Sequence, residues 1–196
     1  MLEFRLFGAR VRISIWFAAA VCASLLLERR TRVWWLVFLL AHELSHIAAA
    51  AVCGERVRAI DLCAGRLRLQ SVASLRTLRA QLLISASGPA ANLLLAGAFA
   101  LLARPEEYAL NLLLAVYNLL PVRSLDGGAI LLCLLLRCTR AEKAFCISRW
   151  VSCCTVFAIT SLGFYILLRF QAPHMLLVGG LLVVGGFSEN EYTNRS

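Results

Sequence analysis

Long stretches of apolar residues, separated by short polar segments, run along almost the whole chain. A helix needs roughly 17 to 25 apolar residues to cross a bilayer. Stretches of this kind occupy six positions: 11–27, 33–52, 80–103, 108–136, 150–170 and 173–188. The pattern therefore predicts an all-α polytopic membrane protein with about six transmembrane helices.

Two segments outside these stretches show a different period. Between Leu2 and Leu6, apolar and charged residues alternate, which is typical of a strand. In the loop 53–79, arginines alternate with apolar residues on both sides of a short turn at 63–65. We expect a small membrane-associated β-hairpin or sheet on the cytoplasmic side. The alternative is a basic loop that lies on anionic lipid headgroups.

The fourth apolar stretch is interrupted by the segment "NLLPVRSLDGG", Asn118 to Gly128. Proline inside an apolar stretch breaks a helix, because it lacks an N–H donor and its ring collides with the preceding turn. Non-helical backbone at membrane depth is tolerated only where it is buried in protein or lines a wet cavity. The break therefore predicts a functional site in this part of the chain.

Composition agrees with the membrane assignment. The chain is 61% hydrophobic and 16% charged, and its mean hydropathy is +0.78, which is outside the balance of soluble domains. The sequence shows no internal repeat and no linker to a second folded unit. We expect one embedded domain over 1–188 and a short C-terminal tail over 189–196.

The net charge of +9 gives an expected orientation. With six spans, the N-terminus, the loops 53–79 and 137–149 and the C-terminal tail share one face. That face holds fourteen basic residues and the opposite loops hold five, so the positive-inside rule places both termini in the cytoplasm. The lipid bilayer is thus the expected partner of the basic residues, and no nucleic acid is needed to explain them.

The second apolar stretch carries the strongest chemical pattern in the chain. His42 and His46 are four residues apart, so on a helix their rings lie on one face and can bind one metal ion. Glu43 projects beside them, at the place of the general base in the His-Glu-x-x-His pattern of zinc proteases. Ionisable groups at membrane depth are costly and are usually functional. The pattern predicts a buried metal site with Glu43 as its catalytic base.

A catalytic zinc needs three protein ligands and an open position, so a third ligand is expected elsewhere. The chain has only two aspartates, and Asp61 lies in a cytoplasmic loop. Asp126 follows the helix break at a depth similar to that of His46 if the second and fourth spans run in the same direction. We therefore predict Asp126 as the third ligand. The alternative for Asp126 is an ion pair with Arg123.

With these residues in view, the sequence resembles the site-2 protease family of intramembrane zinc metalloproteases. The resemblance rests on "HELSH", on "NLLPVRSLDGG" and on "SASGPAANLLLAG" (Ser85 to Gly97), which is similar to that family's Gly-Pro-x-x-Asn element. The six-span layout with cytoplasmic termini resembles the stage IV sporulation protein FB type. One departure is that Ser124-Leu125 precede Asp126, where many members have Pro-Leu or Asn-Pro.

The resemblance implies a catalytic core over about 33–136, with one Zn²⁺ held by His42, His46 and Asp126. It implies that Asn118 lies close to the bound substrate, and from there its amide is a candidate donor to the oxyanion. The implied activity is hydrolysis of a membrane-tethered protein near the cytoplasmic face of a bacterial cell membrane. For the sporulation type, it further implies release of a pro-sigma factor and control by inhibitory membrane partners.

Two other functions fit part of the same pattern. A metal-dependent membrane transporter would also place ionisable residues and broken helices at mid-membrane. An inactive protease-like scaffold would keep the fold without the chemistry. The chain shows no paired broken segments in two halves, and it retains both the base and the three expected ligands, so we expect a protease.

Overall fold

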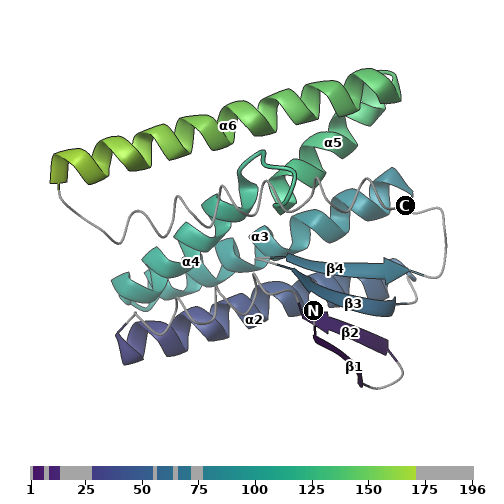
Figure 1. Ribbon diagram of the computed structural model, residues 1–196. Coiled ribbons are helices and arrows are strands. Elements are labelled where there is room, and N and C mark those ends of the chain that lie inside the picture. Colours follow the sequence, from purple (N-terminus) through teal and green to yellow (C-terminus); the bar gives the residue numbers. More distant parts are fainter. Residues whose placement is uncertain are drawn as a thin grey trace. The chain divides into compact units, whose positions relative to one another are not determined.

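The computed structural model describes residues 2–6, 9–13, 28–54, 57–63, 66–71 and 77–170 (Figure 1). The chain forms two compact units, Met1–Leu120 and Pro121–Ser196. The boundary falls inside the predicted break of the fourth apolar stretch.

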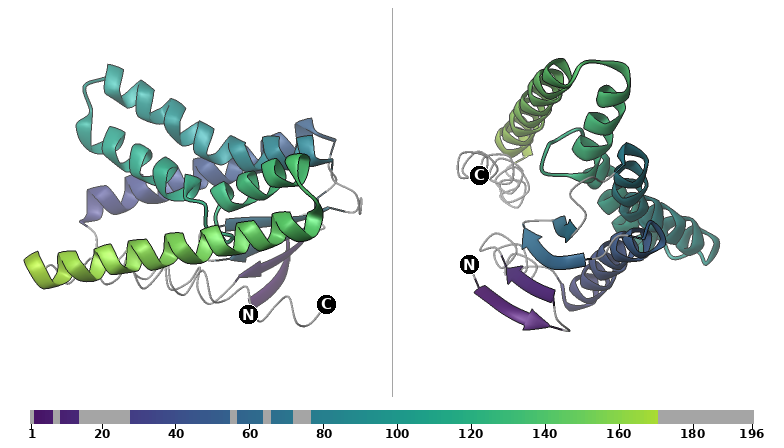
Figure 2. Two further views of the ribbon diagram at one scale, coloured as in Figure 1. Left: turned by 90° about the horizontal axis from the view of Figure 1, so that it is seen from above. Right: turned by 90° about the vertical axis from the view of Figure 1, so that its right-hand side faces the viewer.

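Three helices form the helical part of the first unit: α2 (Arg29–Val52), α3 (Leu78–Leu101) and α4 (Pro105–Leu119). Helix α3 packs against both α2 and α4 (Figure 2). The buried positions of α2 are Phe38, His42, Glu43, His46 and Ala50, which lie on one face of the helix. Those of α3 are mostly small or polar, and they include Ser85, Gly88, Asn92 and Ala96. Small residues let two helices approach closely, which is a common way to pack helices in membranes.

An aromatic cluster joins one end of α2 to α3. The ring of Phe38 is stacked on Trp34 at a centroid distance of 5.3 Å and meets Phe99 edge-on at 5.4 Å. Phe38 is almost completely buried. Aromatic pairs at such distances contribute free energy in addition to that from the burial of their surface. This cluster therefore helps to fix α2 against α3.

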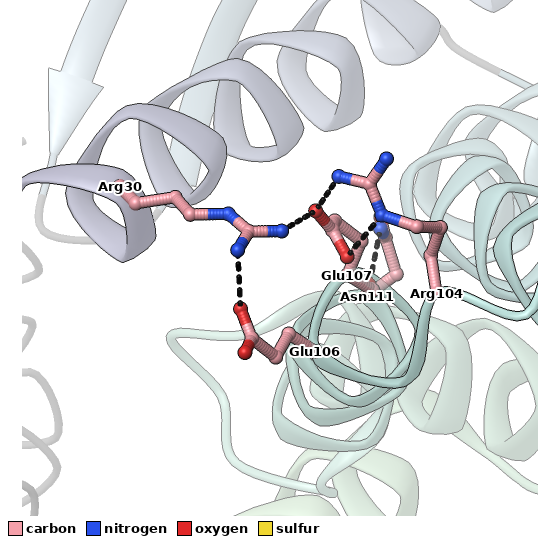
Figure 3. Close-up of polar contacts among 5 residues, drawn as sticks. All are labelled: Arg30, Arg104, Glu106, Glu107 and Asn111. Carbon is pink, nitrogen blue, oxygen red and sulfur yellow. Dashed lines mark hydrogen bonds and ion pairs between the residues drawn. The ribbon is translucent and has the colours of Figure 1, made fainter.

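An ion-pair cluster joins α2 to the start of α4 (Figure 3). Glu107 accepts hydrogen bonds from Arg104, just before α4, and from Arg30 on α2, and Arg30 also pairs with Glu106. The hydrogen bond from Arg104 is the main reason that the pKa of Glu107 is lowered to about 2, and Arg30 adds to the effect. Asn111 donates to the backbone carbonyl of Glu107 one turn further on. The cluster holds the α3–α4 turn against α2.

Four strands of the first unit form one sheet in the order β1-β2-β3-β4 (Figure 1). The strands are β1 (Leu2–Leu6), β2 (Ala9–Ile13), β3 (Val57–Cys63) and β4 (Arg66–Ser71). The β1–β2 and β3–β4 pairs are antiparallel, whereas β2 and β3 are parallel. The β3–β4 pair lies in the segment for which the sequence predicts a hairpin, and β4 also contacts α2.

The second unit contains α5 (Asp126–Cys138) and α6 (Ala141–Phe170). Only Thr139 and Arg140 separate the two helices, which pack against each other (Figure 2). Before α5, the backbone N–H of Arg123 donates to the hydroxyl of Ser152 on α6 at 3.0 Å. This bond ties the non-helical segment 120–125 to α6.

Three of the described helices are long and apolar enough to cross a membrane: Arg29–Val52, Leu78–Leu101 and Ala141–Tyr165. The assignment to the helical membrane proteins is thus confirmed. The predicted span 108–136 is two helices, α4 and α5, separated at the expected break. Residues 14–27 of the predicted span 11–27, and the whole predicted span 173–188, lie outside the described residues, so the number of six stays a prediction.

Two predicted boundaries were wrong. The first apolar stretch was expected to be helical from residue 11, but residues 11–13 belong to β2, because arginines alternate with apolar residues from 9 to 13. The other wrong boundary is that of the predicted loop 137–149. Instead α6 begins at Ala141, because a run with Ala, Glu and Lys favours a helix even when it is charged.

Candidate metal centre

The three residues of the His-Glu-x-x-His pattern lie on the buried face of α2. Relative exposure is 1% for His42, 7% for Glu43 and 4% for His46, whereas the neighbouring Leu40 and Leu44 are more than half exposed. The apolar side chains thus face outward and the ionisable ones inward. This distribution suits a helix in lipid with a polar site on its protein-facing side.

The two imidazole rings face each other through their Nε2 atoms, which lie 3.2 Å apart. The ring planes are nearly perpendicular, at 87°. Two nitrogens bound to one tetrahedral zinc at about 2.0–2.1 Å would be separated by roughly 3.3 Å. The observed spacing of the Nε2 atoms therefore fits two ligands of a single zinc ion.

The Nδ1 atom of each ring is held by a group on α3. His46 Nδ1 lies 2.7 Å from the carbonyl oxygen of Ile84, with the hydroxyl of Ser87 at 3.3 Å. A carbonyl can only accept, so His46 carries its proton on Nδ1 and its Nε2 is left with a lone pair. His42 Nδ1 lies 3.1 Å from the side-chain amide of Asn92. Such partners fix the orientation of metal-binding histidines in known sites.

Gly88 on α3 leaves the space in front of the rings open. A Cβ atom at this position would lie 2.5 Å from Nε2 of His46 and 2.6 Å from Cε1 of His42. Any other residue at this position would therefore collide with both histidine rings. The bare backbone at Gly88 and the donor atoms of the two rings together fit a metal.

Asp126 belongs to the second unit, where it is the first residue of α5 and is 4% exposed. The turn before it is closed by the N–H of Leu125, which donates to the carbonyl of Val122 at 2.9 Å. A Cβ at Gly128 would collide with the backbone of Val122, so glycine is required for this turn. Asp126 as the third metal ligand stays a prediction from the sequence.

Asn118 lies on α4 and is 3% exposed. Its Nδ2 donates to the carbonyl of Leu114 at 3.0 Å, and its Oδ1 has no hydrogen-bond partner among the described residues. One N–H of the amide is thus used within α4. The two acidic residues of α4, Glu106 and Glu107, belong to the ion-pair cluster with Arg30 and Arg104.

Sequence reasoning did not assign a role in the site to Gly88 or Asn92. The signal was present in the Gly-Pro-x-x-Asn element of "SASGPAANLLLAG". Small residues at helix contacts are common in membranes, so the element alone does not point to the histidines. Only the packing of α3 on α2 shows which residues these side chains meet.

Comparisons with known proteins give the fold. No family model and no curated protein match this chain. A similar solved structure is the Site-2 Protease from Methanocaldococcus jannaschii, with a TM-score of 0.67 and 19% sequence identity over 96% of this chain and 94% of that chain. A likeness at this identity shows a shared fold. The chain therefore has the fold of a site-2 protease, with His42 and His46 paired on the buried face of α2.

Proposed function

We propose that the protein is an intramembrane zinc metalloendopeptidase that hydrolyses a peptide bond of a membrane-tethered protein. The observation that carries the proposal is the pair of buried Nε2 atoms, 3.2 Å apart, next to Glu43 on an apolar helix. The fold shared with a site-2 protease supports it. A zinc-dependent peptidase needs this combination of paired imidazoles and an adjacent carboxylate.

The proposed ligands are His42, His46 and Asp126. Two imidazoles and a carboxylate are a donor set that can hold a metal ion, and with zinc such a set leaves a fourth position open for catalysis. When bound, zinc would supply a Lewis acid that activates water and polarises the scissile carbonyl. The proposal is one zinc per chain.

Glu43 acts as the general base and then as the general acid. It takes one proton from the attacking water while the C–O bond to the scissile carbon forms. It gives the proton to the amine nitrogen as the C–N bond breaks. The second N–H of Asn118 is the proposed donor to the oxygen of the scissile carbonyl.

The finer features of the proposal come from the sequence, through its apolar stretches, its charge distribution and the family resemblance. They are six spans with both termini in the cytoplasm, residence in a bacterial cell membrane, and cleavage near the cytoplasmic face. For the sporulation type, the substrate would be a membrane-associated pro-sigma factor, with inhibitory membrane partners. The charge distribution supports the orientation.

The test compares the wild type with Glu43→Gln in cells that also express a candidate membrane-tethered substrate. Glu142→Gln is the matched control, because Glu142 is exposed at the start of α6. We expect the control to cleave like the wild type and Glu43→Gln to keep its metal but lose cleavage. Equal processing by Glu43→Gln would refute the protease assignment.

A further inference from the structure

Asn92 is a fully buried amide in the middle of the apolar helix α3. Its Nδ2 position lies 3.1 Å from Nδ1 of His42, and its Oδ1 position has no hydrogen-bond partner among the described residues. A buried amide in an apolar helix is costly unless its polar atoms are bonded. The contact with His42 is therefore the feature that needs an explanation.

Two other buried asparagines of the same unit use their amides differently. Asn111 donates to the carbonyl of Glu107 at 2.9 Å, and Asn118 donates to the carbonyl of Leu114 at 3.0 Å. Both bonds run within α4 to the residue four positions earlier. Asn92 instead contacts a ring on another helix, and that ring belongs to a proposed metal ligand.

The chemistry of the ring decides which end of the amide must face it. To bind a metal through Nε2, a neutral imidazole carries its proton on Nδ1, which then needs an acceptor. For His46 this acceptor is the carbonyl of Ile84. At His42 the side-chain amide of Asn92 lies 3.1 Å from Nδ1, and its Oδ1 atom supplies this acceptor in the amide orientation turned by 180°.

Turning the Asn92 amide by 180° leaves the same number of its two polar heavy atoms without a hydrogen-bond partner. The two ends of an asparagine amide have the same shape, and their assignment follows from the hydrogen bonds that they make. In either orientation one end contacts His42 and the other has no partner among the described residues. The protonation of the ring thus selects the orientation.

We infer that Asn92 is a positioning residue for the metal site: its carbonyl oxygen accepts from Nδ1–H of His42 and so directs the Nε2 lone pair toward the metal. This inference rests on the proposed function, because it assumes that His42 is a metal ligand. Gly88 and Asn92 then have complementary roles on α3. Gly88 leaves space for the ion, and Asn92 sets the tautomer of one ligand.

The test measures zinc affinity of the purified full chain in detergent, by competition with a chromophoric chelator. Asn92→Leu keeps a similar volume and removes the acceptor, so we expect affinity to fall about 10- to 100-fold, as for other partners of metal-binding histidines. Asn92→Asp keeps an acceptor at the same place and should bind zinc at least as tightly as the wild type. Asn111→Leu removes an equally buried amide that is bonded within α4, and it should bind zinc like the wild type.

The outcomes separate the inference from the proposed function. If the wild type binds no zinc, or His46→Ala binds it equally well, the proposed function fails. If the wild type binds zinc and Asn92→Leu binds it as tightly, only the role of Asn92 is overturned. Thermal unfolding identifies a variant that does not fold. If Asn92→Leu does not fold, the test rests on Asn92→Asp. A zinc affinity of Asn92→Asp that is tenfold or more below that of the wild type then overturns the role of Asn92.

Discussion

Replacing Gly88 with alanine would put a methyl group against both histidine rings. The new Cβ would lie 2.5 Å from Nε2 of His46 and 2.6 Å from Cε1 of both His42 and His46. Ordinary van der Waals contact begins at 3.4 Å. The rings, or α3 itself, must therefore move apart by about 0.9 Å.

A shift of this size is large for a metal site. Metal–ligand distances are defined to about ±0.2 Å, so a displacement several times larger breaks at least one bond to the ion. A misplacement of about 1 Å at a reacting centre costs roughly 10²-fold in rate. We expect Gly88→Ala to lose zinc and at least about 100-fold of its cleavage rate. Alanine also favours a helix by about 1 kcal/mol over glycine, so this loss should occur without unfolding.

The control is Gly97→Ala on the same helix, where a Cβ would meet nothing within 4 Å. Zinc content by elemental analysis, cleavage of a membrane-tethered substrate and thermal unfolding in detergent would be measured for both variants. Gly97→Ala should retain zinc and activity with equal or higher stability. Wild-type zinc content in Gly88→Ala would refute the placement of the metal between the rings and α3.

Three further changes test other parts of the structure. Gly128→Ala should lower zinc content and thermal stability, because its Cβ would collide with the Val122 carbonyl and open the turn before Asp126; wild-type values would contradict this. The pKa of Glu107 is lowered from 4.5 to about 2, so its stabilising effect is complete above about pH 4.5 and is lost as pH falls toward 2. Unfolding temperatures of Glu107→Gln should be lower at pH 7 and converge with the wild type in acid, and parallel curves would argue against this role. Phe38→Ala should cost about 3–5 kcal/mol of unfolding free energy, and a loss below about 1 kcal/mol in denaturant titrations would show that the aromatic cluster is dispensable.

The predictions that succeeded rest on local patterns. The apolar stretches at 33–52 and 80–103 became α2 and α3, because length and hydropathy alone define a spanning helix. The break after Asn118 was expected from proline and glycine, whose backbone preferences act within a few residues. The spacing of His42 and His46 placed their rings on one face for the same reason.

The features that were missed depend on contacts between elements. Nothing near Arg30 in the sequence indicates that it pairs with Glu107, which is 77 residues away. Asn92 and Gly88 act on His42 and His46 only because α3 packs against α2. Such contacts follow from the packed fold, which short-range patterns do not specify.

The most direct test of the account is whether cleavage by the purified protein depends on bound zinc and on Glu43. The protein would be freed of metal with a chelator, resupplied with zinc, and assayed on a membrane-tethered substrate, with Glu43→Gln treated in parallel. The account predicts one zinc per chain in both proteins, and cleavage that is lost and restored with zinc in the wild type alone. Cleavage by the metal-depleted wild type, or equal cleavage by zinc-loaded Glu43→Gln, would contradict it.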